Sequence, residues 1–226
     1  MSVWQILANY HTAFLQGLGV TVELSAIVWG GGLVLGVPAG AIAARFPRIF
    51  GWPFRGVTFI IVSIPVIVLL VWANYPAQEM LGVVIDPFIT SAVVLTAVNI
   101  LAVGDTVRAA MLDFPRGLID AARVSGLTEG ETLRYIQLPL IFRSVSPALL
   151  QQQVVMLQAT IFASLISVNE IFRVAQRVNA QVYRPVQIYS ALAFFFLAVC
   201  VPLNAVAHLL NARLRRSERA LRGEVA

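Results

Sequence analysis

Residues 120–139 read DAARVSGLTEGETLRYIQLP, a polar island in an otherwise apolar chain. The pattern predicts a short helix that ends near Ser125 and a turn at Gly126. A second short helix should follow, with Thr128 as its N-cap and Glu131 three residues later as its partner in a capping box. The stretch therefore predicts a helix-turn-helix that lies outside a membrane.

The rest of the chain has the composition of a membrane protein. Its 226 residues are 59% hydrophobic and 12% charged, and the mean hydropathy is +0.83. This is too apolar for a soluble protein with a polar surface. The net charge is +5, but all 16 basic residues are arginines that lie mainly between and after the apolar runs. They indicate orientation in a membrane rather than binding to nucleic acid.

Five apolar runs are long enough to cross a bilayer, for which about 20 helical residues suffice. They cover residues 12–44, 54–73, 87–111, 143–168 and 186–210. The lead at residues 1–11 has no basic residue, so we expect the first run to be a retained helix and not a secretory signal. The fold class is therefore an all-α integral membrane protein. A single domain, residues 1–226, should hold about five transmembrane helices and a cytoplasmic loop at 115–139.

Two features of these runs affect their packing. Pro65 should loosen the second helix. The second half of the first run contains five glycines, which either form a packing face for another helix or are merely tolerated in lipid. They are Gly30, Gly31, Gly32, Gly36 and Gly40.

The arginines predict the orientation, because loops rich in arginine stay in the cytoplasm. The loops after the first and third runs each contain at least three arginines and the tail contains five, whereas the linker at 74–86 has none. We therefore expect the amino terminus outside and the carboxyl terminus in the cytoplasm. Arg173, Arg177 and Arg184 conflict with this topology, but the residues after Asn169 favour a folded helix that can hold such charges outside.

Seven residues of the polar island resemble, without a gap, the cytoplasmic signature loop of the permease subunits of bacterial ABC importers. They are Asp120, Ala121, Ala122, Gly126, Ile136, Leu138 and Pro139, with Asp in place of the usual Glu. In that family the loop forms a coupling helix that fits a groove on the ATPase subunit. The resemblance implies that these residues couple the chain to an ATPase, and the two alanines would let the partner approach closely. The alternative is an ordinary amphipathic loop between helices.

The wider chain resembles permeases of the polar amino-acid branch, of the histidine, glutamine and arginine type. The resemblance is carried by residues 21–25, 86–88, 133–139, 170–176 and 183–185. It implies a subunit of an ATP-driven importer in the bacterial cytoplasmic (inner) membrane, which moves a polar amino acid or related small solute by alternating access. The implied partners are two ATPase copies, a second permease that is either a copy or a homologue, an extracytoplasmic binding protein and membrane lipid.

The chain departs from that branch at two places. It has Val62-Ser63-Ile64-Pro65 where the branch usually has Arg-Gly-Thr-Pro, and Gln158-Ala159-Thr160 where the branch has Lys-Asp-Thr. These losses of polar residues leave a non-amino-acid solute, of the opine or compatible-solute type, as an alternative.

Enzymatic motifs are missing from the sequence. There is no lysine and hence no Gly-rich phosphate loop followed by lysine, so ATP and Mg should bind only to the partner ATPase, and this chain should need no cofactor. The single Cys200 excludes a disulfide framework, and His11 and His208 lie at opposite ends of the chain,. A secondary transporter would need a repeated architecture, and an intramembrane enzyme would need a catalytic constellation; the sequence shows neither.

Polar residues within the spans are costly unless they have partners or face water, so they are candidates for the solute pathway. Gln151 and Gln158, seven residues apart, share one stripe of a helix. The full set of candidates is Asn99, Gln151, Gln158, Thr160, Glu170, Arg173 and Gln176. Asp105 and Arg108, three residues apart, can pair either as a gate or as a structural ion pair.

Overall fold

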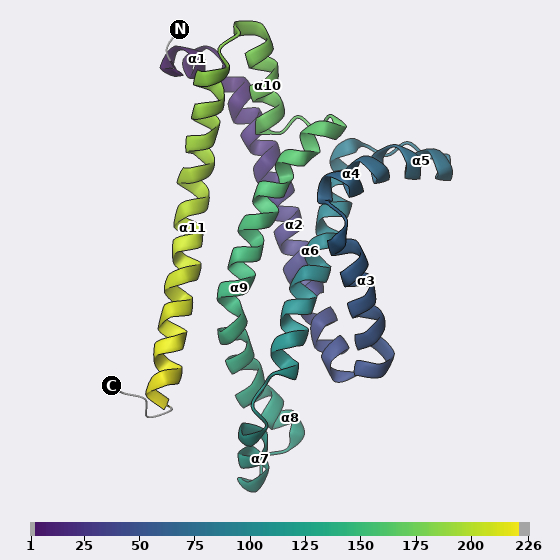
Figure 1. Cartoon of the computed structure of the whole chain (residues 1–226), viewed down its shortest axis with the longest axis vertical. Coiled ribbons are helices and arrows are strands. Elements are labelled where there is room, and N and C mark those ends of the chain that lie inside the picture. The colour runs from purple at the N-terminus through teal and green to yellow at the C-terminus, as the bar shows by residue number, and fades with distance from the viewer. Residues whose placement is uncertain (1–2, 222–226) are drawn as a thin grey trace.

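The computed structural model describes residues 3–221, without the side chains of Leu7 and of residues 215–221. Regular secondary structure in this range is helical throughout. Long helices run side by side along the molecule, and short helices lie at both of its ends (Figure 1). The predicted all-α membrane fold is confirmed.

The helices follow one another in a simple order. They are α1 (Val3–Asn9), α2 (His11–Arg45), the π-helix η1 (Pro47–Gly51), α3 (Trp52–Ser63), α4 (Val66–Asn74), α5 (Pro76–Leu81), α6 (Pro87–Leu112), α7 (Arg116–Val124), α8 (Glu129–Glu131), the π-helix η2 (Thr132–Gln137), α9 (Leu138–Ala159), the 3-10 helix η3 (Thr160–Ile166), α10 (Ile171–Val182) and α11 (Pro185–Leu221).

Four helical stretches among the described residues are long and apolar enough to cross a membrane. They are His11–Arg45, Pro87–Leu112, Glu129–Ile166 and Pro185–Leu214. The pair Pro47–Ser63 and Val66–Leu81 makes a fifth if the two bent parts count as one span. The stretch Glu129–Ile166 corresponds to the run expected at residues 143–168. It begins earlier, because the π-helix η2 runs directly into α9.

The second span differs from the expected helix over residues 54–73. Pro65 does more than loosen it, since the helical stretches on either side meet at 92°. Ile64 is extended, with φ −89° and ψ 128°, as a residue before proline prefers,. As a result α4 and α5 leave the bundle sideways, as the blue segment in Figure 1 shows. Part of the linker predicted at 74–86 is therefore the helix α5.

The centre of the bundle is the contact between α2 and α6. Gly32, Gly36 and Gly40, spaced by four residues, face α6, and a Cβ atom on Gly36 would lie 2.9 Å from the carbonyl oxygen of Ile100. At Gly30 a Cβ atom would meet nothing within 4 Å. The packing-face interpretation therefore holds for Gly31, Gly32, Gly36 and Gly40, since a Cβ atom on Gly31 would lie 2.5 Å from Thr96 of α6, while Gly30 is merely tolerated.

A hydrophobic cluster lies toward the end of the bundle where α6 begins. It joins Leu24 and Val28 of α2, Leu95 of α6, Leu70 of α4 and Ile166 of η3, each at most 1% exposed. Between helices in a membrane, such side chains stabilise the bundle by close packing and not by leaving water. Leu70 thus fastens the laterally projecting α4 to the bundle.

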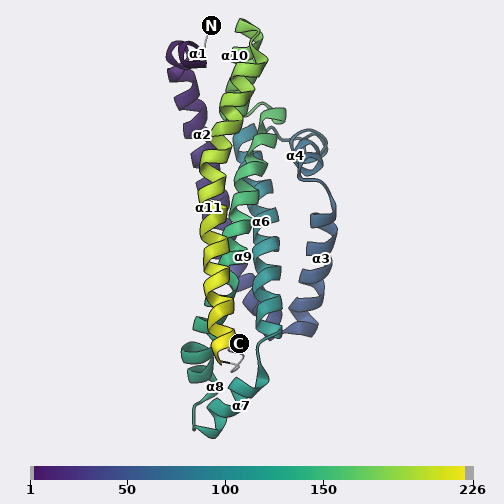
Figure 2. The same cartoon turned by 60° about the vertical axis from the view of Figure 1, so that its left-hand side comes forward.

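The short helices mark two ends of the molecule. α7 and α8 project from one end, here called the loop end (Figures 1 and 2). α1, α10 and the pair α4–α5 lie toward the other end, here called the arm end after the sideways projection of α4 and α5. The helix expected after Asn169 is α10, so that prediction is confirmed. Among the tail arginines, Arg215, Arg216, Arg219 and Arg222 lie outside the residues whose side chains are described.

Candidate coupling surface and solute pathway

The loop end carries the helix-turn-helix that the sequence predicted. α7 ends at Val124, and Gly126 adopts the left-handed conformation with φ 81°, which favours glycine,. The backbone N–H of Leu127 then donates to the carbonyl oxygen of Ala122 at 3.1 Å and closes the turn. The motif therefore turns at the glycine that the sequence identified.

The capping box at the start of α8 is complete. The backbone N–H of Thr128 donates to Glu131 Oε2 at 2.9 Å, and the N–H of Glu131 donates back to Thr128 Oγ1 at 3.3 Å. The hydroxyl of Thr128 also donates to the Glu131 carboxylate, which holds the pKa of Glu131 below its usual range. The second helix thus has a fixed beginning even though it lies in solvent.

The signature residues divide into exposed and packed positions. Asp120, Ala121 and Pro139 are exposed, whereas Ile136 and Leu138 are half-buried. Ala122 is only 3% exposed, so of the two alanines expected to receive a partner, only Ala121 offers its side chain to the surface. Val124, which the sequence analysis did not single out, is 90% exposed at the end of α7. The sequence feature that could have identified Val124 is its position shortly before the turn at Gly126.

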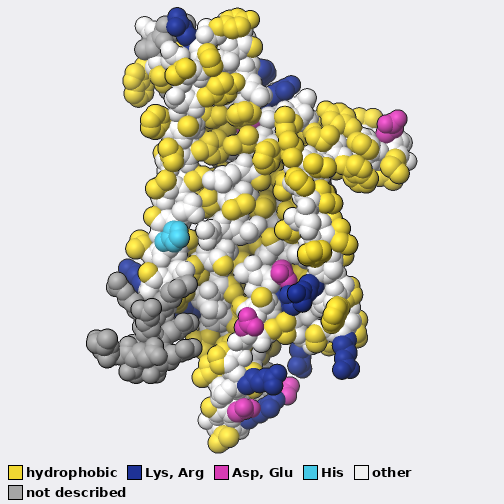
Figure 3. Space-filling model, in the orientation of Figure 1, with side chains coloured by type: hydrophobic (Ala, Val, Ile, Leu, Met, Phe, Trp, Pro, Cys, Tyr) yellow, Lys and Arg dark blue, Asp and Glu magenta, His cyan; other side chains and the backbone are white. Residues whose placement is uncertain are grey.

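Charged side chains tie this helix-turn-helix to the end of α2. Glu129 lies 3.8 Å from Arg45 and 3.6 Å from Arg123, and Arg123 also lies 4.0 Å from Asp120. Figure 3 shows basic and acidic side chains gathered at the loop end. A groove of about 680 Å³ separates the loop from α2. Such exposed pairs are worth at most about 1 kcal/mol each, so they orient the loop without locking it.

Two buried amides lie in the middle of the bundle. Asn99 of α6 is 0% exposed, and its Nδ2 donates to the carbonyl oxygen of Val28 and to Gln153 Oε1, both at 2.9 Å. Gln153 of α9 is 4% exposed. The candidate set named Gln151 and Gln158 of α9 but omitted Gln153, because the sequence does not show which glutamine faces Asn99.

Two further pathway candidates are also inside the protein. Thr160 is 0% exposed and donates to the carbonyl oxygen of Leu157 at 2.7 Å. Glu170 is 0% exposed, and its carboxylate accepts from the backbone N–H groups of Phe172 and Arg173 at 2.8 and 2.7 Å. It is the N-cap of α10, outside the spans, and burial raises its pKa to about 7. In this conformation neither side chain has surface for a solute.

The remaining candidates have accessible surface. Gln151 and Gln158 are exposed on the same face of α9, and neither amide has a hydrogen-bond partner in the described part of the chain. Arg173 and Gln176 are half-buried on α10, and Arg173 Nη1 donates to the carbonyl oxygen of Ser164 at 3.4 Å. The structure therefore separates an exposed amide stripe from the buried polar groups.

Asp105 and Arg108 form the ion pair that their spacing predicts. Arg108 Nη2 lies 2.8 Å from Asp105 Oδ1, and its Nε donates to the same oxygen at 2.9 Å. Both residues belong to α6, so the pair satisfies the charges within one helix.

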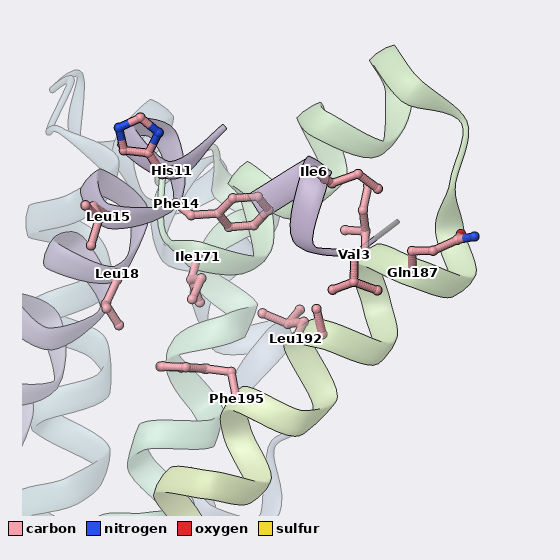
Figure 4. Close-up of a pocket in the computed structure, with 12 residues that line it drawn as sticks. Val3, Ile6, His11, Phe14, Leu15, Leu18, Ile171, Gln187, Leu192 and Phe195 are labelled. Carbon is pink, nitrogen blue, oxygen red and sulfur yellow. The ribbon is translucent and has the colours of Figure 1, made fainter. Parts of the chain in front are cut away.

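Two other depressions lie toward the arm end. One, of about 320 Å³, is bordered by Glu23 of α2, Asp86 before α6, and Asn169 before α10. The other, of about 390 Å³, is apolar and lies among α1, α2, α10 and α11. Figure 4 shows Phe14 and Leu18 facing it from α2, and Phe195 from α11. No group of three or more metal-binding side chains occurs among the residues described.

Comparison with known proteins agrees with this architecture. Over 219 residues the chain is 30% identical to the glutamine transport system permease protein GlnP of Escherichia coli (strain K12), covering 94% of this chain and 97% of GlnP. It is 28% identical to the histidine/lysine/arginine/ornithine permease HisQ of Salmonella typhimurium (strain LT2) over 222 residues, covering 92% of this chain and 96% of HisQ.

A solved structure shares the fold. A chain in the crystal structure of an amino acid ABC transporter with histidines superimposes with a TM-score of 0.82 at 21% identity, covering 92% of this chain and 96% of that chain. The family model for the inner membrane component of binding-protein-dependent transport systems matches residues 36–216, most of the sequence. The chain therefore belongs to the family of binding-protein-dependent transport system inner membrane components.

Proposed function

We propose that this chain moves a polar amino acid or a related small solute inward by alternating access. As an inner membrane component of an ABC importer, the chain is the permease and not the ATPase, and its partners include an ATPase and a binding protein. We further propose that two ATPase copies bind at the loop end, and that a second permease completes the pathway.

The shape of the loop end supports the ATPase assignment. The helix-turn-helix of α7 and α8 projects beyond the bundle, and Val124 exposes an apolar side chain next to the turn at Gly126. Ala121 and Gly126 are exposed and small, so the surface of another protein can approach the backbone closely here. The seven signature residues, Asp120 to Pro139, are proposed to act here, with Ala122 in a supporting role inside the loop.

The observation that carries the solute pathway is the amide stripe on α9. Amides within a membrane span are costly unless they meet water or another polar group. Because Gln151 and Gln158 are exposed and without partners in the described residues, we propose that they line the water-filled path. Arg173 and Gln176 remain secondary candidates. For Asn99, Thr160 and Glu170 we now propose structural roles, since their hydrogen bonds are satisfied inside the protein.

The solute class rests on two arguments. The relatives compared above are permeases named for glutamine and for histidine, lysine, arginine and ornithine, which favours a polar amino acid. The replacement of the branch's usual Asp by Ala159, which is buried in the hydrophobic cluster, favours weaker demand for a free α-amino group. An opine or compatible solute is therefore the second candidate.

Uptake by the reconstituted complex tests this assignment. Glutamine, arginine, histidine, an opine and a betaine should be compared as labelled solutes, first with the wild-type permease. For the accepted solute, Gln151→Ala or Gln158→Ala should raise the concentration needed for half-maximal uptake about tenfold or more, as loss of a hydrogen bond to a charged group implies. Basal ATP hydrolysis should persist. Gln152→Ala, at the half-buried position next to Gln151, is the control and should have little effect on uptake. Unchanged uptake in both Gln151→Ala and Gln158→Ala would contradict the proposed pathway.

We propose that the loop end faces the cytoplasm and the arm end faces outside. The helical segments at the loop end contain six arginines, which the positive-inside rule assigns to the cytoplasm. They are Arg45, Arg48, Arg55, Arg116, Arg123 and Arg134. In a Cys200→Ala background, Met80→Cys should react with a membrane-impermeant thiol reagent added to intact cells. Gly130→Cys should react only after the membrane is opened. The reverse pattern would overturn the orientation.

A further inference from the structure

A tight turn joins the first two spans at the loop end. Its residues 45–55, here called the elbow, cover the last residue of α2, the π-helix η1 and the first turn of α3. Gly51 lies close to α2, because a Cβ atom there would be 2.7 Å from the carbonyl oxygen of Ala43. The rings of Phe46 and Phe50 pack edge to face, with their centroids 6.2 Å apart. The elbow is therefore an ordered surface and not a loose connection.

The elbow carries positive charge without a matching negative charge. Arg45, Arg48 and Arg55 are all exposed. The sequence contains no Asp or Glu from residue 24 to residue 78. Arg45 lies 3.8 Å from Glu129 of α8. Arg48 and Arg55 have no hydrogen-bond or ion-pair partner in the described part of the chain. Two guanidinium groups are thus available to an anion.

Large apolar side chains alternate with these arginines. The exposed ones are Phe46, Ile49, Phe50 and Trp52, and the apolar surface continues along α3 to Phe59. Aromatic and basic side chains together are typical of the level at which a membrane span meets the lipid headgroups. A small soluble anion would leave the apolar side chains uncovered. The ligand that fits therefore has both an anionic group and acyl chains.

The position of the elbow separates it from the surface proposed to bind the ATPase. α7 and α8 project beyond the level at which α3 begins, in both views of the chain (Figures 1 and 2). Figure 3 shows basic side chains both on this projecting loop and at the base of the region occupied by α3. A protein seated on α7 and α8 meets the projecting loop first. The elbow stays near the ends of the spans, where the polar headgroups of the bilayer lie.

We propose that the elbow binds an anionic phospholipid. Its phosphate accepts hydrogen bonds from Arg48 and Arg55, and its acyl chains cover the apolar surface of α3. Arginine suits this role, since a guanidinium group can donate two parallel hydrogen bonds to a phosphate. A zwitterionic lipid offers the same phosphate with a compensating ammonium group, which the arginines repel. The site goes beyond solute transport and does not depend on which solute is accepted.

Photo-crosslinking in vesicles tests this lipid site. A benzophenone amino acid replaces Ile49, which is 69% exposed, in the purified complex of the permease with its ATPase. The complex is reconstituted in vesicles of phosphatidylcholine and phosphatidylglycerol with identical acyl chains. The adducts are identified by mass, and the ratio of phosphatidylglycerol to phosphatidylcholine adducts is divided by the ratio in the vesicle. This enrichment should be high at Ile49, whereas adducts at Leu197, 54% exposed on α11, should follow the vesicle composition.

Substitutions of single arginines test the source of the enrichment. Two arginines at about 1 kcal/mol each predict an enrichment of about 30-fold at Ile49, and removal of one should lower it to about fivefold. Arg48→Gln and Arg55→Gln are the test variants, and Arg48→Lys keeps the charge and should keep most of the enrichment. Arg213→Gln, which removes an exposed arginine from α11, is the matched control and should leave the enrichment unchanged. Basal ATP hydrolysis shows that each variant has assembled.

The outcomes distinguish the possible ligands of the elbow. Lipid adducts at Ile49 in proportion to the vesicle composition, adducts only with a protein, or no adduct at all would each overturn the proposal. An unchanged enrichment in both Arg48→Gln and Arg55→Gln would also overturn it. Inorganic phosphate added at the concentration of the lipid should not reduce the enrichment. If it does, the elbow is a site for small anions and not for a phospholipid.

Discussion

Asn99 and Gln153 join α6 to α9 through their side-chain amides inside the bundle. Asn99 Nδ2 donates to Gln153 Oε1 at 2.9 Å, and Gln153 Nε2 lies 3.5 Å from Asn99 Oδ1. Because Asn99 also donates to the backbone of Val28 on α2, three membrane-spanning helices meet at one polar point. Hydrogen bonds between helices in a membrane contribute modest stability but fix which helices meet.

Replacing either amide should destabilise the protein without changing its oligomeric partners. Asn99→Ala and Gln153→Ala should each lower the free energy of unfolding by about 1–2 kcal/mol, because the first leaves Gln153 buried and unpaired and the second removes one of the two acceptors of Asn99,. The double variant should cost less than the sum of the two. Thermal unfolding in detergent measures this, with Gln151→Ala as the exposed control. Strict additivity would show that the two amides are not coupled.

The close approach of α2 and α6 makes a second prediction. Gly36→Ala should lower the free energy of unfolding by about 1–3 kcal/mol, since its new methyl group would press on the backbone of Ile100,. Gly30→Ala should be neutral, because the position is open. Comparison of the two melting temperatures checks the packing face. Equal melting temperatures would contradict it.

Local features were predictable from the sequence and tertiary ones were not. Gly126, Thr128 and Glu131 determine a turn and a cap within a few residues, so the helix-turn-helix could be predicted. Pro65 predicted a weak point, but the 92° bend also depends on Leu70 packing into a distant cluster. A proline alone does not reveal how far a helix will turn.

The candidate site was predicted in the same uneven way. Polar residues in the spans could be identified, but their partners lie on other helices. Asn99 meets a residue 54 positions away in the chain, and the cap at Glu170 places its carboxylate inside the protein. Gln151 and Gln158 differ from the structural polar groups in their exposure. Exposure depends on how the helices pack, so the sequence alone could not distinguish them.

Glu170 predicts how stability depends on pH. Its pKa is raised to about 7 in the folded protein because burial disfavours the carboxylate. The folded state therefore holds this proton more tightly than the unfolded state, whose carboxyl has an ordinary pKa near 4.5. The resulting stability is fully present below about pH 4.5 and is lost as the pH rises through 7.

Melting temperatures across this range test the Glu170 prediction. The wild-type protein should melt at a lower temperature at pH 8 than at pH 5, and Glu170→Gln should reduce that difference. Glu79→Gln removes an exposed carboxyl on α5 and should keep the wild-type profile. If Glu170→Gln also keeps that profile, Glu170 does not titrate as described.

Gly126 should affect coupling more than folding. A Cβ atom there meets nothing within 4 Å, but the φ of 81° costs a residue other than glycine about 1–2 kcal/mol,. Gly126→Val should therefore insert and assemble while its solute-stimulated ATP hydrolysis falls. Gly130→Ala, equally open but in ordinary helical geometry, should hydrolyse ATP normally. Normal stimulation in Gly126→Val would show that the turn does not transmit ATPase motion.

The most direct test of the central claim is the energy source for uptake. The permease and its ATPase are reconstituted into vesicles with the solute-binding protein outside, and uptake of the accepted solute is followed with ATP inside and all ion gradients collapsed. Uptake should require ATP and should persist without a gradient, because the chain is proposed to be driven through its coupling loop. Uptake that follows an ion gradient in the absence of ATP would contradict the account.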